Sequence, residues 1–179
     1  MMMKFFSLLP VLLLFIGINV NAQEQIKREA VLDDFPKGYT PREVGTKLAD
    51  HFVPSKHFLH GGKWIHYAEV CTWLGALRYA RAAGDTTMIG RLKDRFEPLF
   101  HEESAYLPVK NHVDLNMFGC LPLEFYQICK DKRYYDLGIP YADTQWALPS
   151  DAKPEEKAYA RKGFSWQTRL WIDDMFMIT

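Results

Sequence analysis

The hydrophobic positions after residue 40 alternate between two kinds of helical pattern. Segments with a single apolar stripe at three- or four-residue spacing are typical of surface helices. These segments cover residues 40–52, 85–96 and 133–147. Segments that are apolar nearly all round are typical of buried helices. These cover residues 64–83, 115–129 and 168–179. We therefore predict an all-α chain of six helices in which every second helix is buried.

Local signals predict several helix ends. Pro41 stands at the first position of the first helix, where a missing N–H costs least. Gly84 is predicted to end the second helix, and Asp85 to cap the third. Residues 57–63 and 148–165 contain glycine or proline and are expected to be loops. The apolar stripe of the first helix is expected to consist of Val44, Leu48 and Phe52.

Three helical hairpins, each with one buried helix, are the pattern of an α/α toroid of the (α/α)6 barrel type. The buried helices of such a fold run in the same direction, so their N-terminal ends meet at one mouth of the ring. Tyr67, Asp114 and Asp173 fall near these ends, one in each hairpin, at separations of 47 and 59 residues. Three hairpins cannot close a ring of six, and residue 179 falls inside the last helix. We therefore expect this chain to be the N-terminal half of a longer barrel.

Two adjacent carboxylates, Asp173 and Asp174, stand inside the otherwise apolar last helix. Burying an unpaired carboxylate costs several kcal/mol, and Asp is a poor residue for a helix interior. A functional site would explain both residues. The structural alternative is that one of them pairs with Arg169 and the other caps a neighbouring helix.

The first residues have the pattern of a secretory signal peptide. Lys4 supplies a positive start, residues 5–18 form an apolar run, and small residues allow cleavage after Ala22. The run is too short and wrongly flanked for a membrane-spanning helix. We expect an exported protein, periplasmic or secreted, with no membrane association after cleavage. The predicted division is a signal peptide at 1–22, an extended lead-in at 23–39 and a helical domain at 40–179.

Composition narrows the classes of partner. The formal net charge is zero and no basic stripe is present, which argues against nucleic acid. Aromatic residues make up 15 % of the chain, and they suit a core or a sugar-binding cleft. Cys71, Cys120 and Cys129 lie in apolar helical stretches and are expected to be free buried thiols, although an exported protein could pair two of them. No zinc or calcium motif is present, so no metal site is expected.

Three blocks of this sequence resemble a known family. The blocks are HYAEVCTWLGALRYARAAGD at 66–85, NHVDLNMFGCLPLEFYQ at 111–127 and RLWIDDMFMIT at 169–179. Their order and spacing resemble those of the unsaturated uronyl hydrolases of glycoside hydrolase families 88 and 105, and most of all the unsaturated rhamnogalacturonyl hydrolases of family 105. The resemblance implies an (α/α)6 barrel catalytic domain over residues 40–179. It also implies an acidic oligosaccharide substrate and no cofactor.

Enzymes of this kind hydrate the C4–C5 double bond that polysaccharide lyases leave on the terminal uronic acid of pectin or rhamnogalacturonan, and so depart from the usual two-carboxylate scheme. By resemblance, Asp173 matches the catalytic acid/base, and Asp114 matches the second required aspartate. Tyr67 and Trp171 match aromatic residues of the pocket. The remaining substrate-binding candidates are His66 and Arg169, the latter as a clamp for the substrate carboxylate.

Each of these candidates also has a structural alternative. Asp114 could cap the helix that follows it, His66 could be a structural residue at the start of a helix, and Tyr67 and Trp171 could belong to the core. Asp174 is expected to have a secondary role in pairing or solvent contact.

The chain departs from the family at one place. Many members carry a histidine before the terminal block, whereas this chain has none after His112. Arg161, Lys162 and Trp166 are the candidates for that place.

Two rival functions remain open from the sequence. One is an epimerase or lyase built on another α/α toroid, which histidines acting as general bases at the mouth would favour. The other is a non-catalytic exported module that binds oligosaccharide through its aromatic residues. Resemblance in fold does not by itself distinguish these functions, because one fold can support several chemistries. The reading frame downstream of Thr179 is the observation that would best distinguish them. Half a ring is expected to have little activity by itself.

Overall fold

The computed structural model describes residues 34–110 and 112–168. The predicted signal peptide, most of the lead-in and the whole of the terminal block therefore lie outside the described residues. Residues up to Thr40 form one unit, and the residues from Pro41 onward form a second unit. Its elements are α2 (Pro41–Phe52), β1 (Leu59–His60), β2 (Trp64–Ile65), α3 (Tyr67–Ala83), α4 (Thr86–Phe96), η1 (Glu97–Phe100), η2 (Ser104–Tyr106), α5 (Val113–Asn116), η3 (Met117–Gly119), α6 (Cys120–Cys129), α7 (Lys132–Trp146) and α8 (Pro154–Arg161).

The described part of the chain is all-α apart from two two-residue strands, as the hydrophobic pattern predicts. α2 begins at Pro41, α3 ends at Gly84 with a left-handed φ of 68°, and the Asp85 carboxylate accepts a hydrogen bond from Met88 N at 2.8 Å. These ends agree with the sequence because capping depends only on residues within one turn. None of the described helices is long and apolar enough to cross a membrane.

The predicted stripe of α2 is confirmed at Phe52 but wrong at Val44 and Leu48. α2 buries Ala49 and Phe52, whereas Leu48 is 66 % exposed. The reason is a close approach of backbone to ring: a Cβ on Gly45 would lie 2.4 Å from Tyr79 on α3. The small residues of α2 therefore face α3, because a larger side chain would hold the helices apart.

The loop predicted at residues 57–63 contains part of a β-hairpin. β1 and β2 pair antiparallel, with Leu59 opposite Ile65 and His60 opposite Trp64. Gly61 and Gly62 form the turn, both with positive φ. Strands of two residues have too few positions to produce a recognisable alternation, so the sequence pattern did not predict them.

The loop predicted at residues 148–165 contains α8, which is a correction. Pro149 and Pro154 favour a loop in the sequence, but Pro154 occupies the first turn of α8, where proline is tolerated. The Glu156 carboxylate accepts a hydrogen bond from Lys153 N at 2.6 Å and so caps the helix start. α8 buries none of its residues, so no apolar stripe was present to indicate it.

The core is centred on the Phe96 ring of α4. Five other rings lie around it, with centroid distances between 5.3 and 5.9 Å; they belong to Trp73, Phe100, Phe118, Phe125 and Tyr134. α5, η3 and α6 bury residues nearly all round at their start, as predicted. α3 is buried along one face only and exposes Thr72, Gly75 and Arg78. All three cysteines are free, and Cys129 is exposed rather than buried.

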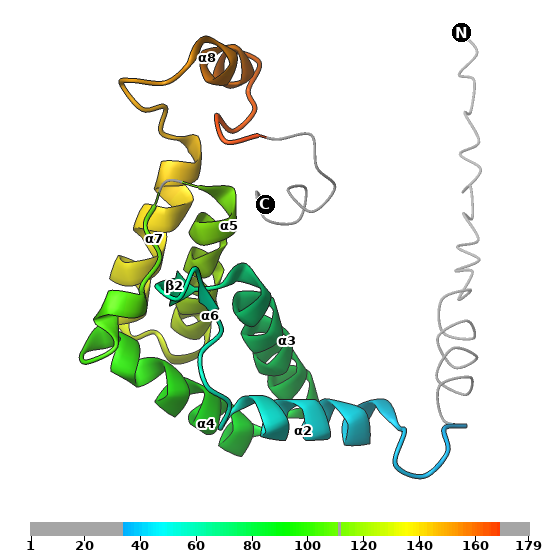
Figure 1. Ribbon diagram of the computed structural model, residues 1–179. Helices are drawn as coiled ribbons and strands as arrows, with labels where there is room; N and C mark the ends of the chain where they lie inside the picture. Colours follow the sequence, from blue (N-terminus) through cyan, green and yellow to red (C-terminus); the bar gives the residue numbers. More distant parts are fainter. Residues whose placement is uncertain (1–33, 111, 169–179) are drawn as a thin grey trace, which may run out of the picture. The chain divides into compact units, whose positions relative to one another are not determined.

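α6 and α7 pack side by side, with η3 also against α7 (Figure 1). Glycines allow the close approach: a Cβ on Gly119 would lie 2.5 Å from Tyr141 Cβ and 3.1 Å from Gly138 O. Neither contact can be relieved by rotating a side chain. Gly138 O belongs to the backbone, and Tyr141 Cβ is fixed to the backbone by a single bond.

Gly119→Ala is therefore expected to destabilise the chain by about 1–3 kcal/mol, the usual cost of overpacking. The measurement is the free energy of unfolding from urea titration. Gly90→Ala in α4 is the matched control, because a Cβ there meets no atom within 4 Å. Alanine in a helix interior should stabilise that position by roughly 0.5–1 kcal/mol. Equal effects of the two changes would contradict the close approach.

Candidate active site

α3 and the α5–η3–α6 segment run in parallel. Cys71 Sγ lies 3.8 Å from Met117 Sδ, and further along both helices Arg81 forms an ion pair with Glu124. From the first contact to the second, the residue number increases in α3 and also in the α5–η3–α6 segment. The two therefore run in the same direction. Tyr67 lies one turn before Cys71, and Asp114 nearly one turn before Met117. Both residues therefore lie at the N-terminal ends of their helices, at one level.

Three aromatic rings lie in a row where the β-hairpin meets α3, each tilted by 31–35° against the next. The His66 ring lies 4.5 Å from the Phe58 ring and 4.4 Å from the Tyr67 ring, measured between centroids. His60, at the end of β1, lies 5.4 Å from His66. We call Phe58, His66 and Tyr67 the ring stack. The ring stack brings a phenol and an imidazole to the start of α3, with the His60 imidazole beside them.

His66 has the structural role that the sequence left open. Its Nδ1 accepts a hydrogen bond from Ala68 N at 3.1 Å and caps α3, so the neutral ring carries its proton on Nε2. Burial lowers the pKa of His66 below 6.5, the charge of His60 lowers it further, and the charge of Asp114 acts in the opposite direction. His66 is therefore neutral at pH 7 and can donate a hydrogen bond through Nε2.

Asp114 does not cap the helix, which corrects one alternative. The cap of α5 is His112, whose Nδ1 accepts a hydrogen bond from Asp114 N at 3.3 Å. An Asp114 carboxylate oxygen lies 3.5 Å from the same nitrogen, and the side chain is 19 % exposed. Because Asp114 acts electrostatically on His66, the two segments approach each other at this end. The carboxylate thus reaches the surface at the mouth while its backbone is held in the helix.

The structure brings together three of the six predicted site residues: Tyr67, His66 and Asp114. Asp173, Trp171 and Arg169, with Asp174, lie outside the described residues. Sequence reasoning missed His60, Phe58 and His112. For Phe58 and His60 the available signal was the run FLHGGKWIHY at 58–67, which holds five aromatic or histidine residues around a glycine pair.

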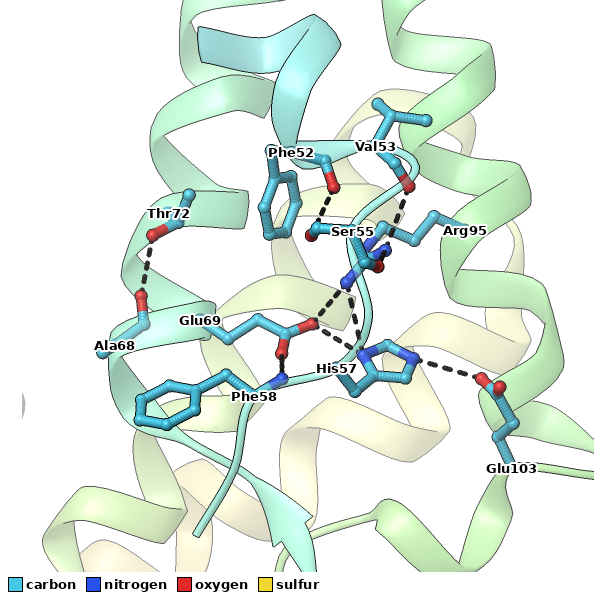
Figure 2. Close-up of polar contacts among 10 residues, drawn as sticks. All are labelled: Phe52, Val53, Ser55, His57, Phe58, Ala68, Glu69, Thr72, Arg95 and Glu103. Carbon is cyan, nitrogen blue, oxygen red and sulfur yellow. Dashed lines mark hydrogen bonds and ion pairs between the residues drawn. The ribbon is translucent and has the colours of Figure 1, made fainter.

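A cluster of polar side chains lies next to the ring stack, in the interior of the fold. Figure 2 shows the Glu69 carboxylate receiving three hydrogen bonds: from His57 Nδ1 at 2.6 Å, Arg95 Nη2 at 2.9 Å and Phe58 N at 2.5 Å. His57 Nε2 in turn lies 3.1 Å from a Glu103 carboxylate oxygen. We call Glu69, Arg95, His57 and Glu103 the buried network. Glu69 is only 4 % exposed, so its charge depends on these partners.

The charges of the buried network are set by its own members. Burial acts to raise the pKa of Glu69, but hydrogen bonds from His57, Phe58 N and Arg95 outweigh it, and the pKa is lowered below 4.5. Burial acts to lower the pKa of His57, but Glu69 and Glu103 raise it above 6.5 against the opposing charge of Arg95. Glu69 is therefore ionised, and His57 favours its protonated form.

Two hollows accompany these groups. One, of about 660 Å³, is lined by His57, Arg91, Arg95, Glu103 and Tyr106 among others, and none of the ring stack or Asp114 lines it. The other, of about 610 Å³, lies between α7 and α8 and includes Lys110 and Trp166. Asn116 Nδ2 donates to Gln145 Oε1 at 2.9 Å, so the end of α7 lies level with α5. The second hollow is therefore at the same end of the helices as Asp114.

Within the described residues, no group of three or more His, Cys, Asp or Glu side chains is arranged to hold a metal ion. The functional groups at the N-terminal ends of α3 and α5 are the carboxylate of Asp114, the phenol of Tyr67 and the neutral imidazole of His66.

Helical hairpins whose buried helices run in parallel are the arrangement of an all-α toroid, and the described hairpins are a part of one. The chain belongs to Glycosyl Hydrolase Family 88, whose family model matches residues 42–179. It is a glycoside hydrolase, and its all-α helical hairpins are part of the toroid of that family. No curated protein and no solved structure matches the chain.

Proposed function

We propose that this glycoside hydrolase acts on unsaturated uronyl oligosaccharides, such as the products of pectin or rhamnogalacturonan lyases. The observation that supports the proposal is the position of Tyr67 and Asp114 at the N-terminal ends of two parallel helices of a family 88 chain. The proposal includes export through the predicted signal peptide, since lyase products arise outside the cell.

The reaction is the hydration of an enol ether. A proton is added to C4 and the oxygen of a water molecule to C5, which gives a hemiketal. The hemiketal opens by breaking the bond between C5 and the ring oxygen, leaving a ketone at C5. The hemiacetal left at C1 then collapses and releases the partner sugar. One carboxyl group can supply the proton and afterwards accept a proton from water.

In this proposal Asp173 is that group, and Asp114 holds the substrate and tunes Asp173. Tyr67 and Trp171 enclose the unsaturated ring, His66 donates a hydrogen bond through Nε2, and Arg169 binds the substrate carboxylate. The hollow beside Trp166 is of suitable size for the partner sugar, and its indole is already fixed by a 2.9 Å hydrogen bond to Thr144 O.

The test follows the ultraviolet absorbance of the double bond during incubation of the full-length protein with an unsaturated uronyl disaccharide. We expect the absorbance to disappear, without added metal or nucleotide and in the presence of a chelator. The control substrate is the saturated disaccharide of the same linkage, which hydration cannot cleave.

Cleavage of both substrates at similar rates would point to conventional glycoside hydrolysis and would refute the proposal. Binding of the unsaturated disaccharide without turnover would favour the non-catalytic module.

A further inference from the structure

The base of the β-hairpin is held by Glu69. Phe58, the residue before β1, donates its N–H to the Glu69 carboxylate at 2.5 Å, and its carbonyl accepts a hydrogen bond from His66 N at 2.9 Å. Phe58 is thus fixed on one side by the buried side chain of Glu69, as Figure 2 shows, and on the other by His66, the residue that caps α3.

The backbone position of Phe58 determines the position of its ring. That ring is 57 % exposed and has the His66 ring at 4.5 Å, with Tyr67 beyond it. Most of the surface of Phe58 faces solvent, so core packing alone does not fix it. The hydrogen bond from Glu69 supplies the constraint that burial does not.

Glu69 is itself fixed by groups from two other segments. Arg95 on α4 donates to Glu69 and also to the carbonyl oxygens of Val53 at 3.0 Å and Ser55 at 2.5 Å. His57 donates to Glu69 at 2.6 Å from the residue next to Phe58. The segment between α2 and the hairpin is therefore held at four points by one ion pair. A buried ion pair adds little net stability over an apolar replacement, whereas its hydrogen bonds specify a geometry.

We propose that Glu69 is a positioning residue of the active site, which through Phe58 holds the ring stack in register with Asp114. Glu69 does not touch substrate. The expected change in KM rests on the proposed function. The geometry of the ring stack does not, because it can be measured without turnover.

The test compares Glu69→Gln with Glu124→Gln in the full-length protein. Both glutamates belong to packed helices and accept an arginine, but Glu124 pairs with Arg81 away from the hairpin. Glutamine cannot accept from three donors as the carboxylate does. We expect Glu69→Gln to raise KM about tenfold, the change that corresponds to one charged hydrogen bond, with a smaller effect on kcat. Glu124→Gln should leave both constants unchanged.

The second readout is the NMR titration of the His66 imidazole. In the unaltered protein His66 should titrate below 6.5 because of burial and the charge of His60. Glu69→Gln should move this titration toward 6.5 as the stack loosens, and Glu124→Gln should not.

Phe58→Leu removes the linking ring while leaving the buried network intact, and it covers the case in which Glu69→Gln fails to fold. It should shift the His66 titration and raise KM in the same direction. An unchanged His66 titration in either folded variant would overturn the positioning role. A shifted titration in a protein that never turns over the unsaturated disaccharide would support the positioning role and refute the proposed function.

Discussion

Replacing Asp173 by asparagine is expected to lower kcat for an unsaturated uronyl disaccharide by about 10²–10⁴-fold, the usual contribution of a positioned general acid or base. Asparagine keeps the shape of the side chain but cannot transfer a proton. The protein should still fold and bind substrate, so KM should change much less than kcat. The measurement is the rate of absorbance loss in the full-length protein, with binding followed separately by calorimetry.

Asp174→Asn is the matched control, because it makes the same chemical change one residue further along the chain. We expect it to act mildly and mainly on stability. Loss of activity in Asp174→Asn with near-normal activity in Asp173→Asn would show that the assignment is wrong by one residue. If neither change affects turnover, both aspartates are structural and the hydration mechanism does not apply to this chain.

Replacing Arg95 by alanine is expected to lower the free energy of unfolding by about 3–5 kcal/mol, the cost of removing one partner from a buried ion pair. Glu69 would then be a buried carboxylate without its guanidinium, and the carbonyls of Val53 and Ser55 would lose their donor. The guanidinium of Arg95 also lies over the rings of Phe52 and Trp73, so these contacts are lost as well. Denaturant titration measures the change.

Arg91→Ala is the control for this prediction. Arg91 belongs to the same helix and pairs with Asp50, but both side chains are largely exposed. Exposed ion pairs contribute about 0–1 kcal/mol, so Arg91→Ala should change stability by no more than that. Equal losses in the two variants would mean that the buried network contributes no more than a surface pair.

The sequence by itself predicted α2, α3, α4, α6 and α7 and several of their ends, but neither α8 nor the β-hairpin. Gly84 ends α3 and Asp85 caps α4 as predicted, since capping and periodicity act within one or two turns. The resemblance to a hydrolase family was also available from the sequence, and it agrees with the family 88 match over residues 42–179. The position of Tyr67 and Asp114 at the N-terminal ends of parallel helices agrees with a simple property of helical hairpins: every second helix points the same way.

Only the tertiary structure decided which side chains meet across those helices. Glu69 accepts hydrogen bonds from His57 and Arg95, which lie 12 residues before it and 26 residues after it in the chain. No periodic pattern relates these positions, because a buried ion pair depends on where three separate segments are packed. The same holds for α2, whose helical stripe suggested that Leu48 faces the core. Gly45 packs closely against the Tyr79 ring, and this packing leaves Leu48 exposed to solvent. Close packing of the two helices therefore outweighs the apolar stripe in deciding which face of α2 is buried.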